Sequence, residues 1–148
     1  MVIYMKAIET ALSLTQAYKL GIERFEKMLG DEFAKAVDSM NNTSTHIIVC
    51  GMGKSGLVGR KISSTLASTG TPSIFLHPAE AIHGDLGKVQ KNSVVLLISY
   101  SGETGEIIAL IPALKRLDVN IIALTGVKNS TLANKSDIVL DTSVDREA

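Results

Sequence analysis

The sequence lacks the features of a disulfide-stabilised, membrane-spanning or nucleic-acid-binding protein. It contains one cysteine, Cys50, so no disulfide can form within the chain. Its 15 basic and 15 acidic side chains cancel to a formal net charge of zero. Because these charges are scattered, neither a nucleic acid nor a charged membrane surface is expected as a partner. The longest apolar stretches, such as residues 94–98 and 107–112, are far shorter than the roughly 18 residues of a membrane-spanning helix.

The N-terminus also lacks an apolar run long enough for a signal peptide. Lys6 and Glu9 come before such a run can form, so we expect the protein to stay in the cytoplasm. With 148 residues, 45% apolar and 20% charged, the chain has the size and composition of one ordinary globular domain. We expect an N-terminal helical segment over residues 1–45 and an α/β core over residues 46–148.

The helical segment predicts two helices. Apolar residues recur at helical spacing from Val2 to about Leu29, where Gly30 ends the pattern. Asp31 can cap a second helix that reaches Met40, before a polar run at residues 41–45. The first helix is amphipathic and offers more apolar surface than one small sheet can cover. We therefore expect it to mediate self-association.

From His46 onward, short buried strands alternate with helices. This alternation predicts a three-layer α/β fold, with a five-stranded parallel, flavodoxin-like sheet covered on both faces. The expected strands are residues 47–50, 73–76, 93–98, 120–125 and 137–141, and the expected helices are residues 55–69, 104–118 and 130–135, with a turn at 79–82. Pro112 falls inside the second of these helices and should kink it near Ile108.

Two loops that follow predicted strands are candidates for ligand binding, because ligands of open parallel sheets lie beyond the carboxyl ends of the strands. The segment GMGKSG (residues 51–56) follows the first strand, and SYSGETGE (residues 99–106) follows the third. Each leads into a helix whose free amides favour an anion. Ser99, Ser101 and Thr104 offer more hydroxyls than one helix cap needs. A phosphate on a small uncharged body, such as a sugar, fits best.

Other interpretations of the glycine loop are weaker. It matches the dinucleotide pattern G-x-G-x-x-G, but His77 and Pro78 stand where the second strand of such a fold ends in an acid. A nucleoside triphosphate loop needs a glycine where Ile48 stands. A simple tight turn, with Gly56 allowing close packing of helix and sheet, stays open for this loop taken alone.

The sequence resembles the SIS (sugar isomerase) domain, which binds phosphosugars through a serine-rich loop of the kind found at residues 99–104. More narrowly, the segments GMGKSG, GRK, STLASTGTPSIFLHPAEAIHGDLG, SYSGETGEI, ALIPALKRL and DREA resemble the arabinose 5-phosphate isomerases. The resemblance covers about residues 46–148. It implies interconversion of ribulose 5-phosphate and arabinose 5-phosphate, which supplies the Kdo sugar of lipopolysaccharide.

The resemblance also implies roles for individual residues. Phosphate binding falls on Ser55, with Gly53 beside it, and on the three hydroxyls of residues 99–104. Active-site roles fall on Lys54, Glu106 and Glu147. The family's later Ser-His-Pro-Gly-Gly segment and CBS regulatory domains are not in these 148 residues. We therefore expect sugar phosphate binding with weak or no turnover from this chain alone, and a non-catalytic phosphosugar-binding regulatory module is the alternative.

Aldose–ketose isomerisation needs a base and a positive group, because a proton moves between two carbons through an enediolate. Glu147 is the preferred base, and Lys54 either stabilises the oxyanion or binds phosphate. Glu106 either holds Lys54 and the substrate hydroxyls or complements the helix dipole. His83 could assist ring opening, although a hydrogen bond that organises its loop is the more common role. No metal and no cofactor are expected, and Cys50 is assigned to the core.

Overall fold

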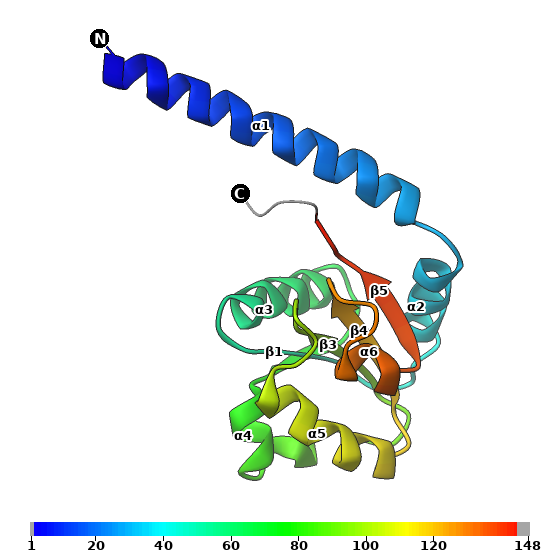
Figure 1. Cartoon of the computed structure of the whole chain (residues 1–148). Helices are drawn as coiled ribbons and strands as arrows, with labels where there is room; N and C mark the ends of the chain where they lie inside the picture. Colours follow the sequence, from blue (N-terminus) through cyan, green and yellow to red (C-terminus); the bar gives the residue numbers. More distant parts are fainter. Residues whose placement is uncertain (1, 145–148) are drawn as a thin grey trace. The chain divides into compact units, whose positions relative to one another are not determined.

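The computed structural model describes the backbone of residues 2–144 and the side chains of residues 5–144. Two compact units divide the chain: Met1–Gly30 belongs to one, and Asp31–Ser143 forms the other. The second unit contains the whole sheet and both candidate loops (Figure 1). The two candidate loops therefore belong to the same unit.

The sheet consists of five parallel strands, which confirms the predicted fold. The strands are β1 (Ile47–Gly51), β2 (Ser73–Leu76), β3 (Val94–Ile98), β4 (Asn120–Thr125) and β5 (Ile138–Asp141). Their order across the sheet is β2-β1-β3-β4-β5, and every neighbouring pair is parallel. The chain moves outward from β1 to β2 and then returns past β1 to β3, so the direction of winding reverses between β1 and β3. Such a reversal leaves a crevice at the carboxyl ends of the two strands.

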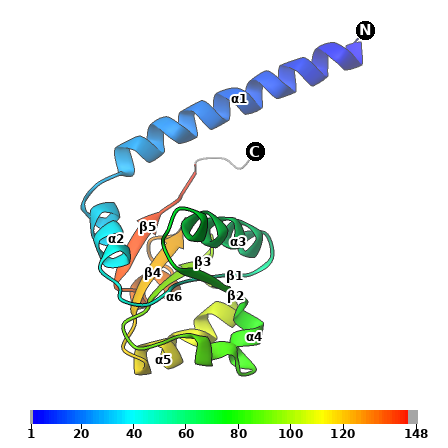
Figure 2. The same cartoon turned by 180° about the vertical axis from the view of Figure 1, so that it is seen from behind.

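Helices cover both faces of this sheet (Figure 2). The helices α2 (Asp31–Asn41) and α3 (Gly53–Ser68) pack on one face, and α4 (Pro78–Ile82), α5 (Gly105–Arg116) and α6 (Thr131–Lys135) pack on the other. Alternate residues of β1 serve the two faces: Ile47 and Val49 belong to one core cluster, and Ile48 and Cys50 belong to the other. This alternation is why a central parallel strand is apolar throughout.

Three local details differ from the sequence predictions. The helix α3 begins at Gly53, so Lys54 and Ser55 lie in its first turn. Residues 79–82 are part of the short helix α4, whose first residue Pro78 has the fixed φ that suits this position. A further 3-10 turn, η1 (Asp85–Lys88), follows it. The helix α5 contains Pro112, as the sequence predicted, and the proline side chain is exposed; the kink near Ile108 stays a prediction.

The helix α3 packs closely against the end of β1 because glycines line their contact. A Cβ atom on Gly56 would lie 2.7 Å from the carbonyl oxygen of Gly51. A Cβ atom on Gly59 would lie 3.1 Å from the Phe75 ring and 3.2 Å from Val49. Glycine at these positions brings the first turn of α3 directly over the carboxyl end of β1, as the tight-turn interpretation of this loop anticipated.

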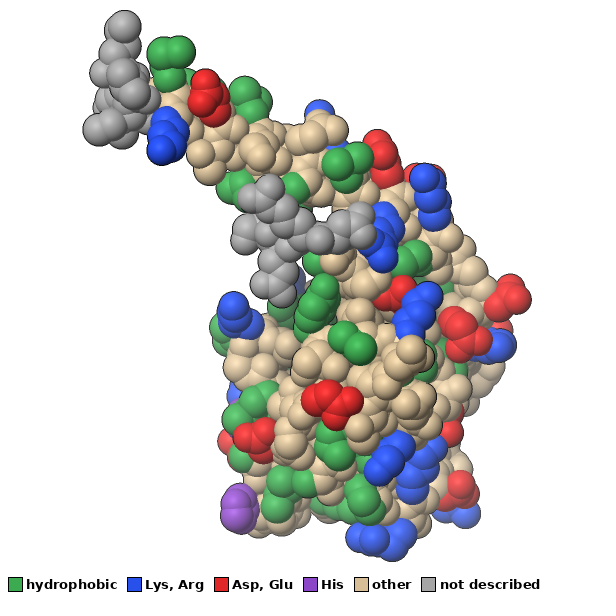
Figure 3. Space-filling view, in the orientation of Figure 1, with side chains coloured by type: hydrophobic (Ala, Val, Ile, Leu, Met, Phe, Trp, Pro, Cys, Tyr) green, Lys and Arg blue, Asp and Glu red, His purple; other side chains and the backbone are tan. Residues whose placement is uncertain are grey.

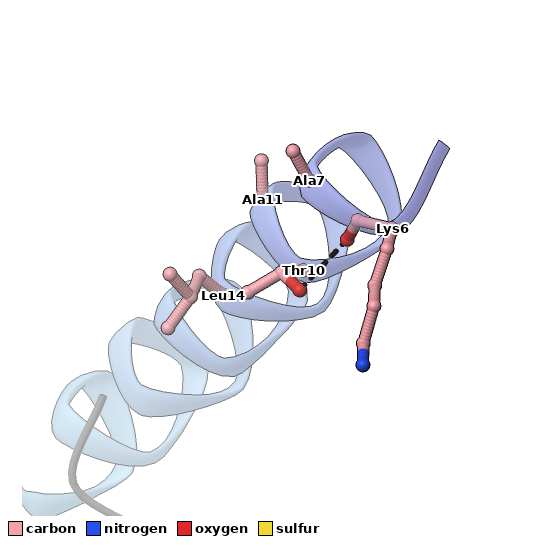
Figure 4. A pocket seen from close by; sticks show the side chains of 5 residues that line it. All are labelled: Lys6, Ala7, Thr10, Ala11 and Leu14. Atoms are coloured by element: carbon pink, nitrogen blue, oxygen red, sulfur yellow. Dashed lines mark hydrogen bonds between the residues drawn. The ribbon is translucent and has the colours of Figure 1, made fainter. Parts of the chain in front are cut away.

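The first unit is dominated by α1 (Val2–Met28), which confirms the long N-terminal helix. Hydrophobic side chains are exposed along it (Figure 3). They are Met5, Ile8, Leu12, Leu14, Tyr18, Leu20, Ile22 and Phe25. A shallow depression on this helix is lined by α1 residues alone, including Lys6, whose carbonyl accepts a hydrogen bond from the Thr10 hydroxyl at 2.8 Å (Figure 4). No helix among the described residues has the length and apolar character needed to cross a membrane.

Candidate functional site

The candidate site lies at the carboxyl edge of the sheet, where β1 and β3 end side by side. Gly51, the last residue of β1, pairs with Ile98, the last residue of β3. The loops that follow therefore leave the sheet from adjacent strands, which in any sheet are about 4.8 Å apart. One loop leads into α3 and the other into α5, on opposite faces of the sheet (Figure 1). Both helices thus begin at the crevice.

The start of α3 leaves backbone donors available. Its N-cap residue, Met52, makes no side-chain cap hydrogen bond. The first amide with an acceptor is that of Gly56, which donates to the Met52 carbonyl at 3.2 Å. The amides of Gly53, Lys54 and Ser55 have no partner among the residues that the structure describes. Three amides directed out of a 16-residue helix provide a favourable position for an anion.

The loop of residues 99–104 is a tight turn around Gly102. This residue has a φ of +65°, and its amide donates to both the carbonyl oxygen and the Oγ of Ser99, at 3.0 and 3.1 Å. Ser99 is only 2% exposed, and its hydroxyl lies 2.7 Å from the hydroxyl of Thr104. The Ser99 hydroxyl is therefore engaged within the turn, and its role as a phosphate ligand stays a prediction.

Further hydrogen-bond donors lie at the end of this loop and in the first turn of α5. Thr104 is the N-cap of α5 but makes no side-chain cap bond, because its hydroxyl is paired with Ser99. Within the described part of the chain, the amides of Gly105 and Glu106 have no acceptor. Ser101 is exposed, and its Oγ accepts a hydrogen bond from the Glu103 amide at 3.2 Å. With that acceptor position filled, the Ser101 hydroxyl can donate its proton to a ligand.

The structure places two of the charged candidates, Lys54 and Glu106, in helix turns that begin at the same edge. Lys54 is exposed in the first turn of α3, and Glu106 is half-buried in the first turn of α5. Neither forms an ion pair with any residue described here, so the expected contact between them stays a prediction. His83 is exposed at the C-cap of α4, in the segment that follows β2. Glu147 lies outside the described residues.

Two carboxylates near the edge are held ionised by their surroundings. Hydrogen bonds from the amide and hydroxyl of Thr131 lower the pKa of Glu103. Burial opposes ionisation of Asp141, but hydrogen bonds from Ser143 and the charge of Lys128, 3.1 Å away, leave the pKa of Asp141 below its ordinary value. At the end of β5 the negative charge of Asp141 is therefore compensated by the positive charge of Lys128.

The described residues were compared with the requirements of a metal site and of a reactive thiol. Over residues 2–144, no group of three or more His, Cys, Asp and Glu side chains is arranged to hold a metal ion. Cys50 is 1% exposed in the middle of β1, and burial raises the pKa of its thiol to about 12. The thiol therefore stays protonated at neutral pH. Because it is buried, Cys50 is a core residue, as the sequence predicted.

The sequence profile of the SIS domain matches residues 40–148. The chain belongs to the SIS domain family. This finding confirms the resemblance carried by the two loops. An arabinose 5-phosphate isomerase of Pseudomonas aeruginosa is 52% identical over 120 residues, which are 81% of this chain and 37% of that protein. Another of Salmonella typhi is 48% identical over 125 residues, which are 84% of this chain and 39% of that protein.

A solved structure of an Escherichia coli protein in complex with arabinose 5-phosphate has the same SIS fold. Its TM-score is 0.80 with 38% sequence identity, over 93% of this chain and 76% of that chain. The present SIS domain spans about two fifths of the length of the curated relatives it matches. The activity of a whole relative is therefore attributed to this chain only as a proposal.

The serine-rich loop of this SIS domain is held by hydrogen bonds from a later part of the chain, which the sequence did not predict. The Tyr100 carbonyl accepts from the Gly126 amide at 2.9 Å and from the Thr125 hydroxyl at 3.1 Å. The Glu103 carboxylate accepts from the Thr131 amide at 2.6 Å. These partners lie at the end of β4 and beyond it. Thr125 is 25 positions after Tyr100, and Thr131 is 28 positions after Glu103. No local pattern indicates contacts over such separations.

Proposed function

We propose that this SIS domain binds a pentose 5-phosphate in the crevice between β1 and β3. One observation carries the proposal: two helices begin at adjacent strands with unpaired amides, next to the hydroxyls of Ser101 and Thr104. A phosphate dianion accepts hydrogen bonds from such groups and is favoured by the positive ends of both helices. Gly53, Ser55 and Ser99 complete the proposed phosphate site.

A dinucleotide is a poorer fit to the same crevice. Dinucleotide-binding sheets hold the ribose hydroxyls with an acid at the end of the second strand. Here β2 ends at Leu76, which is followed by His77 and Pro78. Glu80 comes later, inside α4. A nicotinamide cofactor should therefore leave the melting temperature unchanged, whereas a ligand that binds the folded state raises it.

The proposed activity is interconversion of ribulose 5-phosphate and arabinose 5-phosphate in the cytoplasm, in the pathway to the Kdo sugar of lipopolysaccharide. Support comes from relatives named arabinose 5-phosphate isomerase and from a structural neighbour in complex with that sugar phosphate. The reaction needs no oxidant or reductant, because one proton leaves C2 of the aldose, one is added at C1, and the hydroxyl proton is redistributed through an enediolate. The residues must therefore supply a proton acceptor and stabilise negative charge.

The active-site roles proposed for Lys54, Glu106 and Glu147 within this mechanism are those that the family resemblance implies. Lys54, in the first turn of α3, would stabilise the enediolate oxygen, and Glu106, in the first turn of α5, would hold Lys54 and the substrate hydroxyls. Glu147 would move the proton between the two carbons. His83, after β2, would assist ring opening at the β2 side of the crevice. The placement of the first two at one edge is what makes a shared substrate feasible.

Calorimetric titration with arabinose 5-phosphate tests the placement of the phosphate. Replacing Ser101 and Thr104 together by alanine should weaken binding by more than about tenfold, because each hydrogen bond to a charged group is worth roughly 1.5–3 kcal/mol. Ser68→Ala with Thr69→Ala is the matched control, since those hydroxyls bond to carbonyls at the far end of α3. Unchanged affinity of the Ser101/Thr104 variant would contradict the placement.

Phosphosugar binding without turnover is the second candidate for these 148 residues. It is favoured by the share of each relative that the chain spans, 37% and 39%. A coupled assay with ribulose 5-phosphate, run on this chain and on a full-length protein that contains it, separates the two candidates. We expect turnover from the full-length protein and little or none from the chain. Robust turnover from the chain alone would remove the non-catalytic candidate.

We also propose that the protein forms a homodimer or homotetramer through α1. The support is the row of exposed apolar side chains on this helix, among them Leu12 at 64% and Ile22 at 67% exposure. Burying apolar surface of this kind is the main favourable term in association.

A further inference from the structure

Glu103 lies in the loop of residues 99–104, which we call the phosphate loop. Its amide makes a hydrogen bond within this loop, and its side chain makes a hydrogen bond to α6. Its amide donates to Ser101 Oγ at 3.2 Å, and its Oε1 accepts from the Thr131 amide at 2.6 Å. The neighbouring Gly102 carbonyl accepts from the Leu132 amide at 3.0 Å. Two successive residues of the loop thus accept hydrogen bonds from two successive amides at the start of α6. Thr131 is 28 positions after Glu103 in the sequence.

These contacts leave α6 with no free donor at its start. Besides the amides of Thr131 and Leu132, the Ser130 amide donates to the Val127 carbonyl at 3.1 Å, and the Ala133 amide donates to Ser130 Oγ at 3.3 Å. The positive end of α6 is therefore satisfied by a carboxylate of the protein itself. At α3 and α5 the first amides have no such partner among the described residues, so those two helix starts are left for a ligand.

We propose that Glu103 is a positioning residue for phosphate binding. Its side chain holds the loop against α6, and this keeps the hydrogen bond from its own amide to Ser101 Oγ in place. The inference rests on the proposed function of the loop. When the Glu103 amide fills an acceptor position of Ser101 Oγ, the hydroxyl proton of Ser101 is directed to another acceptor, such as a phosphate oxygen. The same anchoring holds the exposed carboxylate at a backbone donor, which limits its repulsion of a phosphate dianion in the crevice.

The test compares Glu103→Ala and Glu103→Gln by titration with arabinose 5-phosphate and with inorganic phosphate. Glu103→Ala should weaken binding of both ligands by the same factor, about three- to tenfold. Glu103→Gln keeps a carbonyl acceptor for the Thr131 amide and should recover most of the affinity. A purely structural role would lower the melting temperature of both variants without this pattern in affinity.

Asp137→Ala is the matched control for Glu103→Ala, because Asp137 makes the same kind of bond at the amino ends of the strands. Its carboxylate accepts from the Ile121 amide at 2.8 Å, at the start of β4. Asp137→Ala should leave both affinities unchanged even if it lowers the melting temperature. An equal loss of affinity in Asp137→Ala would show a general effect of destabilisation and would overturn the positioning role.

Thr131→Pro removes the other partner of the same contact. Thr131 is the first residue of α6, where proline is well tolerated, and Ser130 before it has an extended ψ of 163°. Thr131→Pro should weaken binding about as much as Glu103→Ala, and the double variant no more than either one. Wild-type affinity in Glu103→Ala would overturn the positioning role alone, whereas absence of binding in the wild-type chain would overturn the proposed function as well.

Discussion

Replacing Gly102 by alanine should destabilise the second unit more than any other single methyl addition in the phosphate loop. Gly102 has a φ of +65°, and a Cβ atom there would lie 2.0 Å from Ser130 Oγ and 2.4 Å from Ser130 Cβ. The Ser130 Oγ atom can turn about χ1, but the Cβ atom is fixed by the backbone at the cap of α6. The loop and α6 would have to separate.

The size of the effect follows from three contributions. The left-handed conformation costs alanine roughly 1–2 kcal/mol. Overpacking a filled site costs typically about 1–3 kcal/mol. Losing the bond from the Leu132 amide to the Gly102 carbonyl adds about 1 kcal/mol. Together they predict a loss of about 3–6 kcal/mol in the free energy of unfolding, or about 10 °C or more in Tm for a chain of this size.

Urea unfolding followed by circular dichroism measures this loss. Gly105→Ala is the matched control, because a Cβ atom on Gly105 meets nothing within 4 Å and its φ is outside the left-handed region; it should stay within about 0.5 kcal/mol of wild type or be more stable. Adding Ser130→Gly to Gly102→Ala should recover the overpacking contribution but not the cost of the left-handed φ. If Gly102→Ala unfolds at the wild-type urea concentration, the described turn and its contact with α6 are wrong.

Three further predictions concern other parts of the chain. Cys50, with a pKa of about 12, should resist alkylation by iodoacetamide at about pH 8 in the folded protein and react once urea unfolds it; rapid labelling of the folded chain would contradict its burial. Lys54→Met in a full-length protein should lower kcat by about a hundredfold or more with little change in KM, as expected for lost oxyanion stabilisation; a raised KM with unchanged kcat would identify Lys54 as a phosphate ligand instead. Removal of residues 1–29 should reduce the oligomeric state measured by light scattering, and an unchanged state would count against self-association through α1.

The sequence predicted the sheet well because its central strands are buried on both faces. Residues of β3, for example, are all buried, so the strand is an unbroken apolar run with clear ends. The region after β2 was harder to predict. The helix α4 is too short for a helical period to be visible, and it depends on burial of Pro78 and Ala81 against the rest of the fold. Such dependence on tertiary contacts is outside the reach of local patterns.

The candidate site was predictable in its outline for a related reason. Once the strands are known, parallel pairing alone brings the loops after β1 and β3 to one edge. The inward engagement of Ser99 with Thr104, and the bond from Glu103 to Thr131, were not predictable, because each depends on the exact path of the turn. The sequence shows which side chains carry hydroxyls and charges, but only the structure distinguishes those that hold the loop from those left for a ligand.

The attachment of the phosphate loop to β4 and α6 has a consequence for protein engineering. A loop that its own protein holds in place before any ligand binds loses little conformational entropy on binding. More of the free energy of the new hydrogen bonds then contributes to the affinity. Its shape, however, is encoded in two places. Transplanting residues 99–104 into another α/β scaffold would carry the hydroxyls but leave behind Gly126 and the amides of Thr131 and Leu132. A functional graft therefore needs both segments and the strand spacing between them.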